Sequence, residues 1–210
     1  MKIAVISESP ADEAAIKILV DAIVGEETNL VPLRLRPGGW PHVLQLLPSI
    51  IKALHYTTDA DGFAVVVDSD NSPVHANDHE ENEQSNSQCR LCLLRNCIQA
   101  TLLELSPVAS RRALKTAAGV AVPAIEAWYQ CGVDLHVNEA RWMGKLSGER
   151  INFTKESLKI AVYGSNQPSL HTETSAAVAA AKRLADNLDK LALLFPNGFG
   201  CLLADVRNWS

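Results

Sequence analysis

The stretch Gly62–Asp68 reads GFAVVVD and is the clearest strand signal in the chain. Its central residues are apolar and mostly β-branched, so we expect a strand that is buried on both faces. Such strands occur in parallel sheets that helices cover on each side. The stretch therefore predicts an α/β protein, and it leaves two acidic residues, Asp68 and Asp70, at the carboxyl end of a buried strand.

The chain on the N-terminal side of this strand supplies two further strands and two helices. A short apolar run, IAVIS, precedes a helix whose start is marked by Ser9 as the N-cap and Pro10 at the first helical position. Helices between strands provide the long crossovers that parallel pairing needs. The expected elements are strands at 3–7 and 30–36 and helices at 10–24 and 41–56, the second helix bent near Pro48.

The chain beyond Asp68 completes the sheet and then becomes helical. A polar, irregular stretch leads to a helix rich in Cys and Leu near 88–105, and the sequence LKTAAGVAV predicts a fourth strand at 114–122. Three further helical patterns follow: one that starts at 123–129, one from about 172 to 194, and a short one after residue 198. We expect a three-layer α/β fold with a central, mainly parallel four-stranded sheet. It is expected to form one domain over 1–210, with an α/β core at 1–130 and a helical extension at 131–210.

The composition is that of an ordinary globular protein. Of 210 residues, 47% are hydrophobic and 20% are charged, which is enough for one sizeable core. The formal net charge of -5 argues against a general polyanion-binding surface but not against a local basic groove. No apolar run reaches the ~20 residues of a membrane helix, no signal segment is seen, and five cysteines in this context favour reduced thiols. We therefore expect a cytoplasmic protein without a membrane partner.

Three carboxylates are expected to meet at one edge of the sheet. Glu8 follows the first strand, and Asp68 and Asp70 follow the third, so adjacent parallel strands would bring them together. Oxygen ligands of this kind suit Mg²⁺ or Mn²⁺. Arg34 and Arg36, at the end of the second strand, could contact phosphate at the same edge. The alternatives are that the aspartates cap a turn and that the arginines are ordinary solvated residues.

The ordered acidic motifs resemble a known family. Glu8 lies in SESPADE after the first strand, the D-x-D pair lies in VVVDSDN, and Glu126 lies in PAIEAWYQCG after the fourth strand. This order resembles the Toprim domain of topoisomerases, primases and OLD-type nucleases. Together with the closing FPNGFGCLLADVRNW, it resembles a Toprim-related bacterial family of unknown function. One departure is that Ser9 follows the glutamate, where the better-known Toprim pattern has glycine.

The resemblance implies a Toprim-like fold and a site for Mg²⁺ or Mn²⁺. It assigns Glu8 as general acid/base, Asp68 and Asp70 as metal ligands, and Glu126 as an additional acid of unknown role. The implied function is magnesium-dependent phosphoryl transfer on a nucleic acid or nucleotide, most simply as a nuclease or nucleotide-processing enzyme. From its position alone, Glu126 could instead be a first-turn helix acid, and Trp128 is expected in the core.

Two other functions remain compatible with the same residues. The first is a non-catalytic interaction module that kept the fold and binds a protein partner or a second copy of itself. The second is a metal-dependent nucleotide-sugar transferase, since D-x-D after a buried strand also holds a metal diphosphate in that class. The length of the chain counts against the transferase, because such enzymes usually need a larger acceptor half than the residues left here.

A second metal site is suggested by histidines and cysteines between the third strand and the following helix. His75 and His79 are followed by Cys89 and Cys92, with Cys97 as a further candidate. These ligand types and spacings could form a tetrahedral zinc site, in an order reversed from the usual zinc finger. The alternative is that the cysteines simply lie on the apolar face of a helix.

Overall fold

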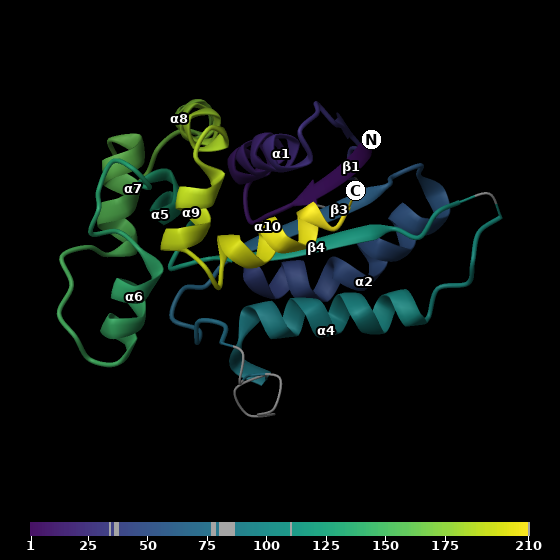
Figure 1. Ribbon diagram of the computed structural model, residues 1–210, viewed down its shortest axis with the longest axis horizontal. Coiled ribbons are helices and arrows are strands. Elements are labelled where there is room, and N and C mark those ends of the chain that lie inside the picture. Colours follow the sequence, from purple (N-terminus) through teal and green to yellow (C-terminus); the bar gives the residue numbers. More distant parts are fainter. Residues whose placement is uncertain (34, 36–37, 77–78, 80–86, 110, 210) are drawn as a thin grey trace.

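A computed structural model describes residues 1–33, 35, 38–76, 79, 87–109 and 111–209. In these residues four strands form one sheet in the order β2-β1-β3-β4, and all neighbouring pairs run parallel (Figure 1). The expectation of a mainly parallel four-stranded sheet is confirmed. The strands are β1 (Lys2–Ile6), β2 (Asn29–Leu30), β3 (Gly62–Asp68) and β4 (Lys115–Ala121).

The central strand β3 is buried on both faces, as its sequence predicts. Phe63, Val65 and Val67 belong to the hydrophobic cluster on one side of the sheet, whereas Ala64 and Val66 belong to the cluster on the other side. Side chains of a strand alternate between faces, so an uninterrupted apolar run can fill both clusters only when helices cover both faces. The burial of β3 therefore fixes a three-layer arrangement.

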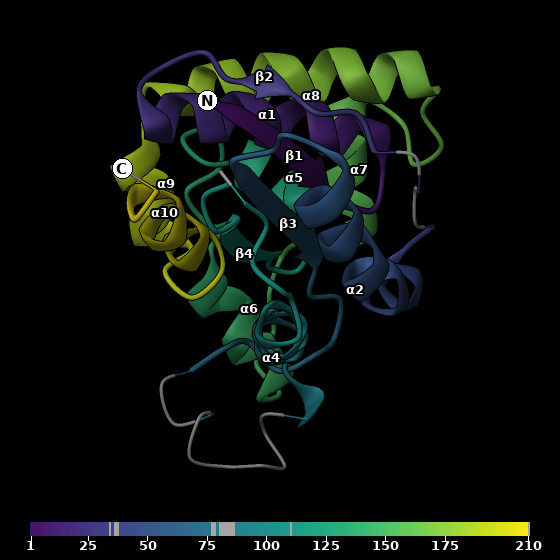
Figure 2. The same cartoon turned by 90° about the vertical axis from the view of Figure 1, so that its right-hand side faces the viewer.

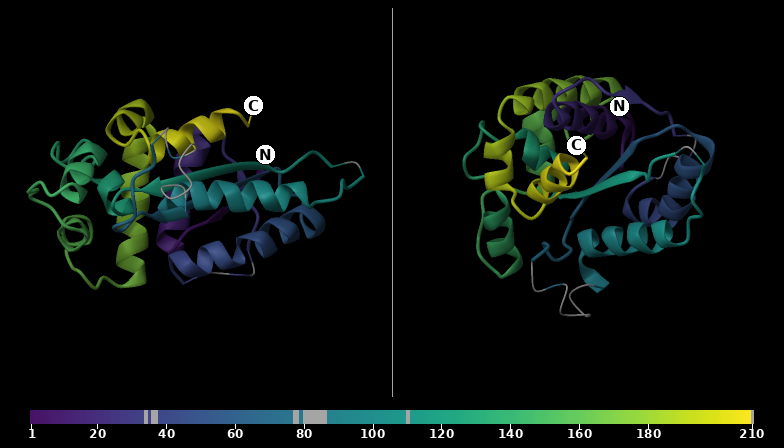
Figure 3. Two further views of the ribbon diagram at one scale, coloured as in Figure 1. Left: turned by 90° about the horizontal axis from the view of Figure 1, so that it is seen from below. Right: turned by 45° about the vertical axis from the view of Figure 1, so that its right-hand side comes forward.

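Helices cover the two faces of the sheet (Figure 2). On one face, α1 (Pro10–Val24) packs against α8 (Leu170–Ala185), and α10 (Phe199–Arg207) packs against β4. On the other face, α2 (Trp40–Thr57) and α4 (Arg90–Leu103) lie side by side (Figure 3). The expected three-layer α/β architecture is thus present. Since α8 and α10 close the core against α1 and β4, residues beyond 131 share the hydrophobic core of the sheet.

Shorter helices lie beyond the carboxyl ends of the strands (Figure 1). They are α5 (Ile125–Tyr129), α6 (Glu139–Leu146), α7 (Lys155–Tyr163) and α9 (Leu188–Leu194). Ligands bind parallel sheets at this edge, so these helices are placed to contribute side chains to a site. Within the described residues, every helix is either too short or too polar to cross a lipid bilayer.

Local signals explain where several elements begin. The helix expected at 10–24 is α1, and the Ser9 hydroxyl accepts a hydrogen bond from the backbone N–H of Asp12 at 3.2 Å. Pro48 lies inside α2, within the helix expected at 41–56.

Trp128 is fully buried and packs edge-on against Phe199 at 5.3 Å between ring centroids, so its expected place in the core is confirmed.

Two expected elements are corrected by the structure. The strand expected at 30–36 is limited to Asn29–Leu30 among the described residues, because Pro32 has no N–H with which to extend the ladder. Arg34 and Arg36 lie outside the described residues. The long helix expected at 172–194 is two helices, α8 and α9, separated at Asp186 and Asn187. The break lets α8 pack on α1 while α9 packs on α10.

Candidate functional site

The carboxyl edge of the sheet brings Glu8 and Asp68 together. Strands β1 and β3 are neighbours, with Ile6 opposite Val65, so the residues just beyond each strand lie at the same level. The Asp68 backbone N–H donates a hydrogen bond to Glu8 Oε1 at 3.0 Å. The adjacency that the sequence analysis required for these two acids is therefore present.

Asp70 turns back toward the same edge. Its φ of 51° lies in the left-handed region, which aspartate enters more readily than most residues. Its backbone N–H donates to Pro123 O at 3.0 Å, which fixes the turn against the end of β4. The Asp70 carboxylate then shares a cation with Asp68, since Lys155 Nζ lies 3.1 Å from Asp68 Oδ2 and also contacts Asp70 Oδ1.

A second cation, Arg90, contacts the same acids. Its Nη2 lies 2.8 Å from Asp70 Oδ2, and its Nη1 donates to the backbone carbonyl of Asp68 at 2.6 Å. The same Nη1 is 3.9 Å from Glu8 Oε1. The guanidinium also stacks over the Trp40 ring at 5.0 Å from its centroid, which holds the side chain in place.

Lys155 and Arg90 were missed by the sequence analysis, although one signal could have found them. Each is the first residue of its helix, Lys155 in α7 and Arg90 in α4. The helix dipole disfavours a positive charge at that end, typically by ~0.3–1 kcal/mol. A cation at the first helical position is therefore a sign that nearby acids compensate for it.

Two further acids face a cavity beside these residues. Asp12, in the first turn of α1, accepts hydrogen bonds from the Ser9 hydroxyl at 2.8 Å and from the Tyr129 hydroxyl at 3.5 Å. Glu126 is buried in the first turn of α5. We call Glu8, Asp12, Asp68, Asp70 and Glu126 the carboxylate cluster. The cavity has a volume of about 450 Å³, and its lining includes Glu8, Asp12, Asp68, Glu126, Lys155 and Lys159.

Burial and mutual repulsion disturb the ionisation of the carboxylate cluster. Burial, together with the charge of Asp68, raises the pKa of Asp12 to about 8 and that of Glu126 to about 7. The same two causes raise the pKa of Glu8, and burial raises the pKa of Asp68 despite the neighbouring Lys155.

Asp70 is the exception in the cluster. Burial raises its pKa, but Lys155 and Arg90 more than offset this effect and hold the pKa below the usual value. Asp70 therefore stays ionised at neutral pH, while Asp12 is mostly protonated.

The residues that could hold Mg²⁺ or Mn²⁺ are the carboxylates at this edge. Carboxylate oxygens from two chain segments lie at this edge, and they are hard ligands of the kind these ions prefer. Burial is the main cause of the raised pKa values of Glu8 and Asp68, and a bound divalent cation would favour the ionised form of both groups. Glu8, Asp68 and Asp70 are the residues placed to hold it. The arginines expected to bind phosphate at this edge, Arg34 and Arg36, lie outside the described residues.

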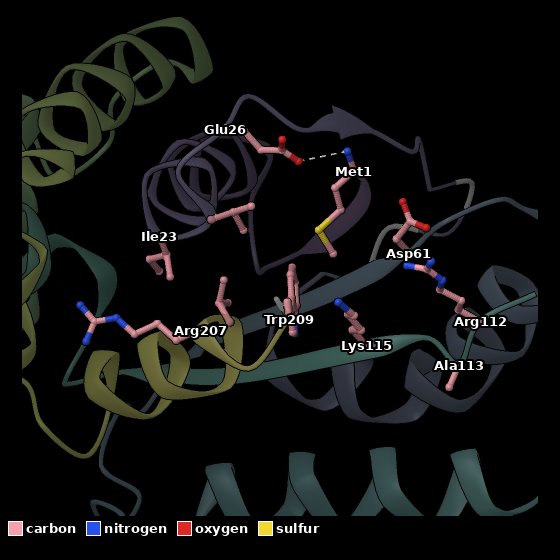
Figure 4. Close-up of a pocket in the computed structure, with 11 residues that line it drawn as sticks. Met1, Ile23, Glu26, Asp61, Arg112, Ala113, Lys115, Arg207 and Trp209 are labelled. Carbon is pink, nitrogen blue, oxygen red and sulfur yellow. Dashed lines mark hydrogen bonds and ion pairs between the residues drawn. The ribbon is translucent and has the colours of Figure 1, made fainter.

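Another cavity, of about 470 Å³, lies near the amino ends of the strands (Figure 4). Met1, Asp61, Lys115 and Trp209 contribute to its lining. The Met1 ammonium group is 3.3 Å from Glu26 Oε1, so its charge is already partnered. Because ligands of parallel sheets bind at the carboxyl edge, the carboxylate cluster is the better candidate site.

Comparison with known proteins leaves the site to be interpreted from its own geometry. No protein-family model, no curated protein and no solved structure matches this chain.

Proposed function

We propose that the protein is a Mg²⁺- or Mn²⁺-dependent phosphoryl-transfer enzyme of Toprim type that acts on a nucleic acid or a nucleotide. The observation that carries the proposal is the meeting of Glu8, Asp68 and Asp70 at the carboxyl edge of the sheet, with Lys155 and Arg90 beside them. An arrangement of acids and cations at one edge suits a substrate that carries phosphate and binds with a divalent ion.

Each residue has a role in this proposal. Asp68 and Asp70, together with Glu8, would hold the metal, whose chemistry there would be neutralisation of phosphate charge and activation of water. Glu8 handles a proton at the same edge, where its carboxylate accepts a hydrogen bond from the Asp68 backbone N–H. Lys155 balances the charge of the two aspartates through its contacts with both.

The neighbouring cavity suits the rest of the substrate. Its volume of about 450 Å³ is typical of small-molecule sites, which span roughly 300–1,000 Å³. Lys159 is in its lining and lies 3.8 Å from Glu173 Oε1 across the cavity wall. A phosphate entering the cavity would contact Lys159 in place of this weak ion pair.

The proposal is tested by metal binding and by activity in the same set of proteins. We would measure Mn²⁺ binding by electron paramagnetic resonance and screen cleavage of DNA, RNA and nucleoside triphosphates with Mg²⁺ and with Mn²⁺. Asp68→Asn is expected to weaken Mn²⁺ binding and to recover part of its activity at high Mn²⁺. Glu8→Gln is expected to lose roughly 10²–10⁴-fold in rate without rescue.

A matched control distinguishes an effect of losing a site residue from an effect of changing the net charge. Glu104→Gln removes an exposed glutamate whose ion pair, within the described residues, is with Lys52 at 2.9 Å. It should match wild type in both assays. Equal Mn²⁺ binding by wild type and Asp68→Asn, or equal rates for wild type and Glu8→Gln on every substrate, would contradict the proposal and favour the non-catalytic module.

A further inference from the structure

Two histidines and two cysteines converge behind the carboxyl edge of the sheet. His75, His79, Cys89 and Cys92 each present one nitrogen or sulfur atom, and these atoms all lie within 4.8 Å of one another. All four residues are buried. Cys97, the further candidate from the sequence, is not in this group, which is consistent with its position two turns along α4 from Cys89.

Two sulfur–nitrogen distances match the spacing that a shared metal ion would impose. Cys89 Sγ is 3.7 Å and Cys92 Sγ is 3.4 Å from the same atom, His75 Nδ1. In a tetrahedral zinc site with bonds of about 2.3 Å to sulfur and about 2.0 Å to nitrogen, a sulfur and a nitrogen are about 3.6 Å apart. Both sulfurs thus approach one imidazole nitrogen at the spacing of ligands that share an ion.

The cluster is poorly explained as an apolar helix face. His79 Nδ1 is buried without a hydrogen-bond partner in the part of the chain that the structure describes. Burying a polar atom without a hydrogen-bond partner is unfavourable, so proteins rarely keep one. The cysteines, all within the described residues, are free of disulfide bonds. A metal ion would use the imidazoles and the thiols together.

We propose that His75, His79, Cys89 and Cys92 bind one Zn²⁺ ion in a closed, structural site. Thiolate and imidazole ligands select zinc over Mg²⁺, and four protein ligands leave no position open for catalysis. Binding releases one proton from each cysteine thiol, and the two thiolates then balance the charge of Zn²⁺. The loaded site carries no net charge, which suits its burial.

The zinc site would hold the start of α4 against the segment that follows β3. Cys89 is the N-cap residue of α4 and has no capping hydrogen bond from its side chain. Arg90 lies between the two cysteine ligands and contacts Asp68 and Asp70. Zinc therefore fixes the backbone from which Arg90 reaches the carboxylate cluster. The proposal does not depend on phosphoryl transfer at that cluster.

Metal content and cobalt spectroscopy test the site directly. Purified wild type, measured by elemental analysis, is expected to hold one equivalent of zinc. Cys92→Ser and His79→Asn should hold much less, and Cys97→Ser, on the same helix, should hold one equivalent. If the ligand variants fail to fold, the test uses wild type alone. Zinc is removed with a chelator and Co²⁺ is added, which should give intense tetrahedral absorption bands and a thiolate charge-transfer band.

Three results would overturn the proposal. The first is wild type that neither retains zinc nor binds Co²⁺ with a thiolate band after chelation. The second is Cys92→Ser protein that is folded and holds as much zinc as wild type, since the ion would then lie elsewhere. The third is Cys97→Ser protein that is folded and loses its zinc. Loss of phosphoryl-transfer activity is not part of the test, so failure here is distinguishable from failure of the proposed function.

Discussion

Asp12 offers the sharpest test of how the carboxylate cluster is ionised. Its carboxyl group has a pKa of about 8 in the folded protein because burial and the charge of Asp68 disfavour ionisation. In the unfolded chain an aspartate ionises near ~3.9. Between these two values the folded state binds a proton that the unfolded chain has released. The contribution of Asp12 to stability is therefore fully present below the unfolded pKa and is lost as pH rises toward the folded pKa.

The size of the effect follows from the linkage relation. When one proton is bound only by the folded state, the free energy of unfolding falls by about 1.4 kcal/mol for each unit by which the pH rises. Between pH 5 and pH 7 wild type should lose roughly 2 kcal/mol through Asp12. Asp12→Asn replaces the carboxyl group by a neutral amide that can still accept from the Ser9 hydroxyl, so this loss should vanish. For a chain of this size, roughly 2 kcal/mol corresponds to roughly 4–8 °C in Tm.

The assay compares urea unfolding of wild type and Asp12→Asn at pH 5, 6 and 7 without added Mg²⁺. The free energy of unfolding of the variant should exceed that of wild type at all three pH values, and the excess should grow by roughly 2 kcal/mol between pH 5 and pH 7. Other raised acids, such as Glu126, titrate in both proteins and largely cancel. Asp189→Asn, at an exposed position in α9, should show no such trend. A difference between wild type and Asp12→Asn that does not change with pH would refute the reasoning.

Three further predictions concern the site and the segment that closes the core. Lys155→Met removes a cation that neutralises the two aspartates. The Mn²⁺ affinity, measured by electron paramagnetic resonance, should therefore rise roughly tenfold, which is about 1.4 kcal/mol. An unchanged affinity would contradict this. Glu139→Ala should lower the free energy of unfolding by roughly 2–4 kcal/mol in urea, and Glu139→Gln by less. The reason is that the buried carboxylate accepts from the Asn197 and Gly198 backbone N–H groups at 3.1 and 3.0 Å. Gly198→Ala would place a Cβ 2.2 Å from Val120 O, so its Tm should fall by several degrees; a wild-type Tm would count against this close approach.

The sequence alone determined the class of fold and the acids at the ends of β1 and β3. These features depend on short-range patterns: an apolar run buried on both faces, as in Gly62–Asp68, and an N-cap followed by proline, as at Ser9 and Pro10. In a parallel sheet the carboxyl ends of all strands share one edge, so the nearness of Glu8 to Asp68 could be expected once β1 and β3 were taken as neighbours. The spacing of His75 to Cys92 likewise suggested a cluster.

Only the tertiary structure decided which residues complete the site. Lys155 and Asp68 are 87 residues apart in the chain, and no local pattern encodes the path that α6 and α7 take back to the sheet edge. The same holds for Asp12, whose pKa depends on burial by α5 and on the charge of Asp68 rather than on its neighbours in sequence. Propensity and periodicity act over a few residues, whereas desolvation and charge pairing depend on what the whole fold places within a few ångströms.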